Sequence, residues 1–173
     1  MMTDSFDIVD KIKYKILHNI EQLTRICNNL KLLNSDIILV NGTFDFLHPG
    51  HLNLLYEAKK LGGLLIVLIN SDDSIKKLKG EDRPIYDQSI RSFYLASLEY
   101  VDFVYVFSEE RITPYFKIIK PKYWVKGSDY INCVDSSELA ESKLYSVELK
   151  FVERNSFSSS DLIKNVTKNL TKQ

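Results

Sequence analysis

Short apolar runs alternate with amphipathic stretches along most of the chain. The runs at 37–40, 64–69, 101–107, 122–125 and 147–152 are bounded by polar, glycine or proline residues and predict strands. Apolar residues at helical spacing predict helices at 50–61, 73–78, 88–99, 109–119 and 137–142, and a final helix beginning at Ser159. Strand and helix signals therefore follow one another in regular order.

This alternation predicts an α/β fold with a five-stranded parallel sheet. Parallel strands joined by helices need right-handed crossovers, which place helices on both faces of the sheet. In such sheets a ligand binds beyond the carboxyl ends of the strands, where the strand order reverses. Candidate functional residues follow four of the predicted strands, at 41–51, 70–73, 126–129 and 156–160. We expect them to share one crevice.

The first part of the chain predicts a long helix at 4–33 that has room for one break. Its apolar residues fall on or near one face: Val9, Ile12, Ile16, Leu23, Ile26 and Leu30. This stripe either covers the parent sheet, which is the commoner use of an amphipathic helix, or pairs two subunits. We therefore divide the chain into a helical lead-in at 1–35 and a main domain at 36–173.

Composition and charge narrow the classes of partner. The 173 residues include 23 Lys plus Arg and 23 Asp plus Glu, so the net charge is zero and no broad basic surface for nucleic acid is expected. The longest apolar run, 61–69, is too short to span a bilayer, and the first residues lack an apolar signal core. Two distant cysteines, Cys27 and Cys133, suit a reducing compartment, so we expect a cytoplasmic protein without a membrane partner.

The segment 41–51, which reads NGTFDFLHPGH, is the strongest candidate for chemistry. It joins a predicted strand to a helix N-terminus, where backbone N–H groups and the helix dipole favour a polyphosphate. His48 and His51 could donate hydrogen bonds to phosphate oxygens during transfer. Taken alone, two such histidines more often cap and pack a helix. A metal pair is disfavoured, because the only further histidine is His18.

Other candidates follow the later strands. Lys79 and Arg83 belong to a basic cluster that is either solvated surface or a set of cations for an anionic substrate. Lys126, Gly127 and Asp129 could serve a phosphate and a hydroxyl, or form an ordinary turn. The serines at 158–160 precede the last predicted helix, where one would suffice as an N-cap and three suggest a second phosphate cradle. Arg91 either faces solvent from its helix or reaches back to a nucleotide.

These ordered motifs resemble the HxGH-containing nucleotidyltransferase superfamily, the cytidylyltransferase-like proteins. The signature is GTFDFLHPGH at 42–51, and further matches are NSD at 70–72, KGEDRP at 79–84, VKGSDY at 125–130 and the late serine run. Within the superfamily the chain most resembles the adenylyltransferase domain of ADP-heptose synthases, over about 16–166. The resemblance implies a Rossmann-like domain, a homodimer, and attack of a substrate phosphate on the α-phosphate of a nucleoside triphosphate, with Mg²⁺ held mainly by the phosphates.

Residues and resemblance together predict three groups of site residues. The catalytic group is His48, His51 and Lys79. The nucleotide-binding group is Asn41, Gly42, Thr43, Phe44, Gly50, His51, Arg91, Lys126, Gly127, Asp129, Ser158, Ser159 and Ser160. The substrate-binding group is Asp45, Asn70, Lys79 and Arg83, and no protein ligand to the metal is assigned.

The substrates predicted by resemblance are ATP and a sugar phosphate such as heptose 1-phosphate. Departures from the family pattern, Ser128 for Gly, Ser159 for Thr and a longer stretch at 131–136, flank the acceptor and leave the sugar open. The alternatives are a CTP-dependent cytidylyltransferase for glycerol 3-phosphate or another polyol or amino-alcohol phosphate, and a nucleotide-binding sensor without turnover.

Overall fold

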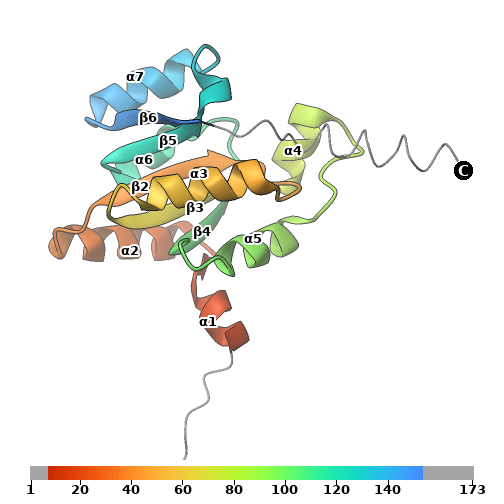
Figure 1. Cartoon of the computed structure of the whole chain (residues 1–173), viewed down its shortest axis with the longest axis horizontal. Coiled ribbons are helices and arrows are strands. Elements are labelled where there is room, and N and C mark those ends of the chain that lie inside the picture. Colours follow the sequence, from red (N-terminus) through yellow and green to blue (C-terminus); the bar gives the residue numbers. More distant parts are fainter. Residues whose placement is uncertain (1–7, 154–173) are drawn as a thin grey trace, which may run out of the picture.

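The computed structural model describes residues 8–153 of the chain, which form an α/β fold around one parallel sheet. Figure 1 shows the elements in order, coloured from red to blue along the sequence. They are α1 (Ile8–Tyr14), β1 (Ile16–Leu17), α2 (Ile20–Leu32), β2 (Ile37–Gly42), α3 (Pro49–Lys59), β3 (Leu64–Asn70), α4 (Asp72–Lys79), α5 (Gln88–Ala96), β4 (Phe103–Phe107), α6 (Thr113–Ile119), β5 (Tyr123–Gly127), the 3₁₀ turn η1 (Ser128–Tyr130), α7 (Ser136–Leu144) and β6 (Glu148–Val152).

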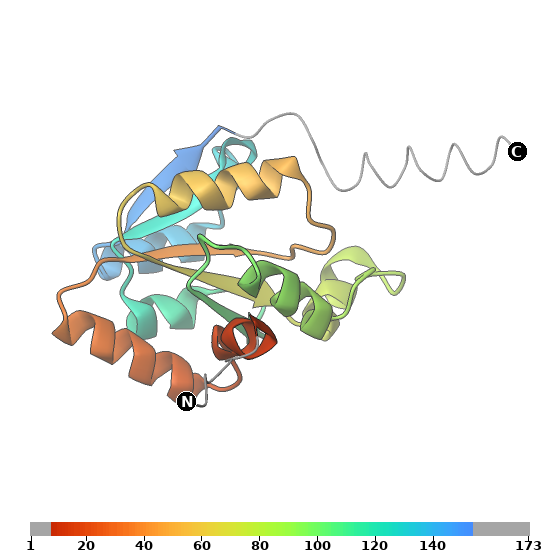
Figure 2. The ribbon, with the colours of Figure 1, turned by 60° about the horizontal axis from the view of Figure 1, so that its bottom comes forward.

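Helices cover both faces of the sheet, as predicted. On one face, residues of α3 and α5 such as Leu55 and Leu95 pack on Val40 and Val67 of the central strands. On the other face, α2 and α6 pack against alternate residues of the same strands in a second cluster. Figure 2 shows α3 and α2 on opposite sides of the strands. The central strands read as unbroken apolar runs because both of their faces are buried.

The sheet has six strands rather than the predicted five. The additional strand, β1, lies at the edge and pairs with β4, with Ile16 beside Val104 and Leu17 beside Tyr105. It divides the predicted helix 4–33 into α1 and α2, and the side chain of Asn19 caps the N-terminus of α2. A strand of two residues is too short to show an alternation of apolar and polar positions. The helical spacing of the apolar residues around β1 therefore led to the prediction of a helix there.

The lead-in packs with the main sheet. Leu23, Cys27 and Leu30 of α2 are buried in the core cluster that also holds Trp124. The apolar stripe of α2 therefore covers the sheet, which is the reading that its amphipathic pattern favoured.

Three helices are shorter than predicted, and one of them, α3, ends at Lys59 rather than at 61. α6 begins at Thr113 rather than at 109, with Pro114 in its first turn, and α5 ends at Ala96 rather than at 99. Proline suits a first turn because it lacks the N–H that would be unsatisfied there. The predicted helix from Ser159 lies outside the described residues. Within the described part, no helix is long and apolar enough to cross a membrane.

The strand order is β1-β4-β3-β2-β5-β6, so the chain reverses direction across the sheet at β2. β2 pairs with β3 on one side and with β5 on the other, which places Val40 between Val67 and Val125. The carboxyl ends of β2 and β5 therefore lie side by side at the switch point. This is where the alternating pattern predicted a ligand crevice.

Candidate active site

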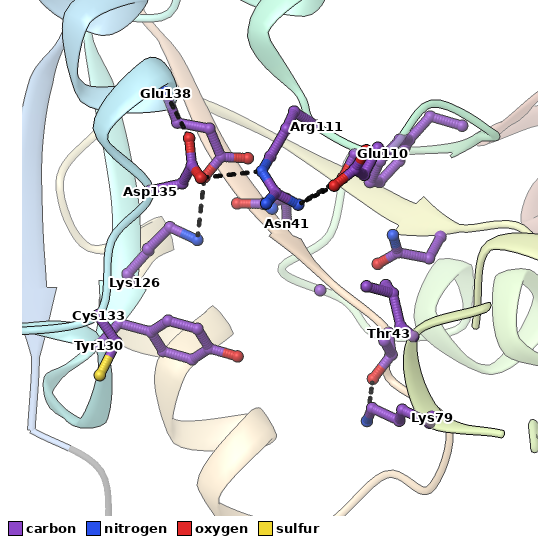
Figure 3. Close-up of a pocket in the computed structure, with 14 residues that line it drawn as sticks. Asn41, Thr43, Lys79, Glu110, Arg111, Lys126, Tyr130, Cys133, Asp135 and Glu138 are labelled. Atoms are coloured by element: carbon purple, nitrogen blue, oxygen red, sulfur yellow. Dashed lines mark hydrogen bonds and ion pairs between the residues drawn. The ribbon is translucent and has the colours of Figure 1, made fainter. Parts of the chain in front are cut away.

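A cavity of about 400 Å³ opens at the carboxyl ends of the central strands. Figure 3 shows its lining, which comes from the ends of β2 to β5, from α4, from the segment between β4 and α6, and from the chain between β5 and the first turn of α7. The lining residues are Asn41, Gly42, Thr43, Asn70, Leu78, Lys79, Phe107, Glu110, Arg111, Lys126, Tyr130, Cys133, Asp135 and Glu138. Six of them were predicted site residues: Asn41, Gly42, Thr43, Asn70, Lys79 and Lys126.

The end of β2 presents polar groups in fixed positions. The buried indole of Trp124 donates from Nε1 to Oδ1 of Asn41 at 2.9 Å, which orients the amide at the cavity wall. Two residues on, the hydroxyl of Thr43 accepts a hydrogen bond from Nζ of Lys79 at 3.1 Å. This contact links the end of β2 to the end of α4 across one side of the opening.

Phe44 bends the chain behind this wall. Its φ is +45°, in the left-handed region that costs a bulky residue about 1–3 kcal/mol. Its ring is buried and approaches Gly42 so closely that a Cβ there would lie 3.1 Å from the ring. A side chain at position 42 would therefore have to push the ring of Phe44 aside by a few tenths of an ångström. The side chain of Phe44 serves this turn rather than lining the cavity.

The two predicted catalytic histidines stack at the start of α3. Their ring centroids are 3.8 Å apart, and the ring of Phe44 lies 4.9 Å from that of His51. His48 is the N-cap of α3, and its Nδ1 accepts a hydrogen bond from the backbone N–H of Gly50 at 3.1 Å. In the neutral ring this fixes the proton on Nε2, so that nitrogen is the donor.

The N-terminus of α3 keeps its positive electrostatic field. Pro49 occupies the first turn, and that turn contains no acidic residue. By contrast, the first turn of α4 carries Asp72 and Asp73, which neutralise the field there. Of these two helices, α3 is the one whose start is suited to an external anion.

Asp45 faces inward and anchors the loop that follows α4. Its side chain is 1% exposed, forms an ion pair with Arg83, and accepts hydrogen bonds from the backbone N–H groups of Ile85 (2.6 Å) and Tyr86 (3.3 Å). The predicted substrate contacts Asp45 and Arg83 are thus engaged with each other and are not among the residues that line the cavity.

Arg91 is also buried, with 0% of its side chain exposed. Its guanidinium donates to the carbonyl of Thr43 at 2.7 Å, to Oδ1 of Asp72 at 2.7 Å, and, through Nε, to the carbonyl of Tyr86 at 3.0 Å. One side chain therefore joins the loop after β2, the start of α4 and the segment before α5. Arg91 therefore does not face the cavity but fixes the position of Thr43, which lines it.

Lys126 is the buried cation of the cavity. Its side chain is 8% exposed, and its Nζ lies 4.7 Å from the ring centroids of both Trp124 and Tyr130 and 4.0 Å from Oε2 of Glu138. Burial lowers the pKa of Lys126 below its usual 10.5, and the charges of Glu138 and Asp129 partly offset this. A cation held in this way is suited to neutralising phosphate in a low-dielectric setting.

The sequence did not predict one wall of the cavity, which we call the far wall and which is formed by the charged residues Glu110, Arg111, Asp135 and Glu138. Arg111 bonds to Oδ2 of Asp135 through Nε at 3.1 Å and to Oε1 of Glu110 at 3.3 Å. Glu138 accepts from the backbone N–H of Ile112 at 3.3 Å. The sequence around Asp135 does predict a helix start, because Asp135 is followed by Ser-Ser-Glu, a pattern typical of a helix N-cap. Nothing in that local sequence shows that Arg111 lies beside Asp135.

The remaining predicted residues either lie in the described chain without lining the cavity, as His48 and His51 do, or lie outside the described residues. Gly127 ends β5, Asp129 is exposed in η1, and Gly50 is buried in α3. The serines at 158–160 lie outside the described residues. Among residues 8–153, no group of three or more His, Cys, Asp or Glu side chains is placed to hold a metal ion.

Comparisons with known proteins agree with this fold. The family model described as cytidylyltransferase-like matches residues 39–165. The chain is 48% identical over 118 residues to the bifunctional protein HldE of a Nitratiruptor species, a match that covers 67% of this chain and 25% of that protein. The chain thus spans about a quarter of the length of this relative. The predicted resemblance to the adenylyltransferase domain of ADP-heptose synthases is confirmed.

Solved structures share the fold. The lipopolysaccharide core biosynthesis protein from Thermoplasma volcanium GSS1 is 26% identical, with a TM-score of 0.58 over 72% of this chain and 99% of that one. The pantoate-beta-alanine ligase from Francisella tularensis, solved with beta-gamma ATP and beta-alanine, is 20% identical, with a TM-score of 0.57 over 91% of this chain and 79% of that one. The second likeness concerns the fold alone.

Proposed function

The chain belongs to the cytidylyltransferase-like family, and on that premise we propose that it transfers a nucleoside monophosphate from a nucleoside triphosphate to a sugar phosphate. The observation that carries this proposal is the cavity at the switch point. There the end of β2, the exposed Lys79 and the buried Lys126 face one space, and the acid-free N-terminus of α3 follows β2 in the chain without lining that space. Two lysines at the cavity and the helix N-terminus after β2 supply positive potential that suits a reaction between two phosphates.

In the proposed reaction, an oxygen of the acceptor phosphate attacks the α-phosphorus of the nucleotide. A new P–O bond forms, the bond from the α-phosphorus to the bridging oxygen breaks, and pyrophosphate leaves with the electron pair. His48 and His51, stacked at the start of α3, would donate hydrogen bonds to the transferring phosphate. Lys126 and Lys79 would neutralise phosphate charge. No side chain acts as a covalent nucleophile.

Mg²⁺ would enter with the triphosphate as part of the substrate. The three carboxylates of the cavity lining are paired, Asp135 and Glu110 with Arg111, and Glu138 with the N–H of Ile112 beside Lys126. Phosphate oxygens are the ligands that Mg²⁺ commonly takes from such substrates. We therefore propose that the phosphates hold the ion and that this chain supplies the surrounding cations.

The resemblance to ADP-heptose synthases, supported by the HldE relatives, favours ATP with a heptose 1-phosphate-like acceptor. The family description, cytidylyltransferase-like, favours CTP, and the second candidate is therefore transfer from CTP to a polyol or amino-alcohol phosphate. A pyrophosphate-release assay separates them. Purified protein with Mg²⁺ is tested with ATP, CTP, GTP and UTP against heptose, pentose, glycerol and ethanolamine phosphates. We expect release that requires ATP and a sugar 1-phosphate. Release with CTP alone would replace ATP by the second candidate, and nucleotide binding without release across the panel would support a sensor.

A further inference from the structure

The three cations of the cavity differ in what holds them. Lys126 is buried between two aromatic rings, and Lys79 donates to the hydroxyl of Thr43. Arg111 stands on the far wall with 38% of its side chain exposed, and its contacts are with Glu110 and Asp135. Figure 3 shows it between these two carboxylates, with Lys126 and Lys79 on opposite sides of the opening. Arg111 is therefore paired with two carboxylates of the cavity lining, whereas Lys126 is paired with one, that of Glu138.

Asp135 is held in place by its other oxygen. Its Oδ1 caps α7 by accepting from the backbone N–H of Ser137 at 2.9 Å and from that of Glu138 at 3.3 Å. This leaves Oδ2 directed at Nε of Arg111, 3.1 Å away. Hydrogen bonds, chiefly the one from the hydroxyl of Ser137, lower the pKa of Asp135 to about 2. The group facing Arg111 is thus a fixed negative charge.

The guanidinium has capacity for another anion. It carries five N–H donors in a planar fork, and its contacts with Asp135 and Glu110 are made through Nε and Nη1. Both carboxylates are partly exposed, at 32% for Asp135 and 78% for Glu110. Partly exposed pairs of this kind contribute little stability, so a phosphate could displace one at low cost.

The rest of the lining suits a hydroxylated molecule. Asn41 and Asn70 supply amides and Thr43 a hydroxyl, while Glu138 lies deeper beside Lys126. Amide and carboxylate groups pair with sugar or polyol hydroxyls as donors and acceptors. A cation on one wall, together with amide, hydroxyl and carboxylate groups elsewhere in the lining, suits a phosphomonoester of a polyhydroxylated molecule.

We propose that Arg111 is a specificity-determining residue that binds the phosphate of the acceptor, and that Asp135 is its resident counter-ion, which competes with that phosphate. This inference rests on the proposed function and names the group that selects its acceptor. It assigns opposite effects to the two members of one ion pair. A purely architectural pair would give the same effect from both sides.

The test is the affinity of the full chain for mannose 1-phosphate, with uncharged mannose as the control ligand, measured by isothermal titration calorimetry. Arg111→Gln should weaken binding of mannose 1-phosphate about tenfold, because it removes a charge-assisted hydrogen bond. Asp135→Asn keeps an N-cap side chain for α7 but removes the competing charge, so it should tighten binding by about twofold to tenfold. Mannose should bind all three proteins equally weakly.

Three outcomes would overturn the inference: wild-type protein that does not bind mannose 1-phosphate, Arg111→Gln with unchanged affinity, or Asp135→Asn that weakens binding as Arg111→Gln does. Melting temperatures of both variants, together with their affinity for ATP, show that each has folded. Pyrophosphate release is scored separately. Phosphate binding with the predicted signs but no release with any nucleotide would count against the proposed function alone.

Discussion

Replacing Arg91 by methionine should destabilise the protein far more than replacing any exposed cation of the cavity. The methionine side chain has a similar length but no donors. It would leave the carbonyls of Thr43 and Tyr86 without the bonds that they now receive at 2.7 and 3.0 Å, and would strand the carboxylate of Asp72. All three partners lose a charged donor that is fully buried.

The magnitude follows from that burial. Removing one partner of a buried ion pair costs about 3–5 kcal/mol, and Asp72, 29% exposed, places this case near the lower end. At about 2–4 °C per kcal/mol for a chain of this size, Arg91→Met should lower the melting temperature by about 6–12 °C. Arg91→Lys keeps the charge but cannot reach all three acceptors, so its loss should be smaller.

The assay is thermal unfolding followed by circular dichroism, with Arg111→Met as the matched control. That substitution breaks an ion pair whose partners are 38% and 32% exposed, so it should cost about 0–1 kcal/mol. The reasoning would be refuted if Arg91→Met melted within about 2 °C of the wild type, or no lower than Arg111→Met.

Three further predictions concern Lys126, the two cysteines and Trp124. Burial lowers the pKa of Lys126 below 10.5, so the rate of turnover should fall as the pH rises through that lowered pKa. The variant Lys126→Arg stays charged and should not show this fall at alkaline pH. An unchanged dependence of the rate on pH in this variant would contradict the proposed role of Lys126 in neutralising phosphate. Burial raises the pKa of Cys27 to about 11, whereas Cys133 is exposed at the cavity. Iodoacetamide should therefore modify Cys133 alone, as detected by mass spectrometry, and bound ATP should slow this modification. Trp124→Phe should lower the free energy of unfolding by about 1–3 kcal/mol in urea, because it removes the bond to Asn41 and leaves a void; an unchanged midpoint would contradict this.

Most of the fold was predictable because the sheet is buried on both faces. Runs such as 64–69, flanked by amphipathic stretches, are typical of central strands, and alternation of strands with helices favours a parallel sheet. β1 was missed because Ile16 and Leu17 continue the helical spacing of the lead-in. Its identity as a strand depends on pairing with β4, a contact far away in the sequence.

The site was predictable where residues directly follow a strand and less so elsewhere. Asn41, Asn70 and Lys126 reach the cavity because the carboxyl ends of parallel strands share one edge. The sequence could not show that Asp45 points away toward the loop at 83–86, since a residue type does not fix the direction of its side chain. Arg111 and Asp135 come from different loops, so only the folded chain brings them together.

The central claim is that the cavity transfers a nucleotidyl group, and the destination of an isotopic label tests it most directly. With ATP labelled at the α-phosphate, Mg²⁺ and a sugar 1-phosphate, the account predicts label in a product joined to the acceptor. It also predicts loss of that product in His51→Ala protein that keeps its melting temperature. Label released as free AMP, or a His51→Ala variant with wild-type turnover, would contradict the account.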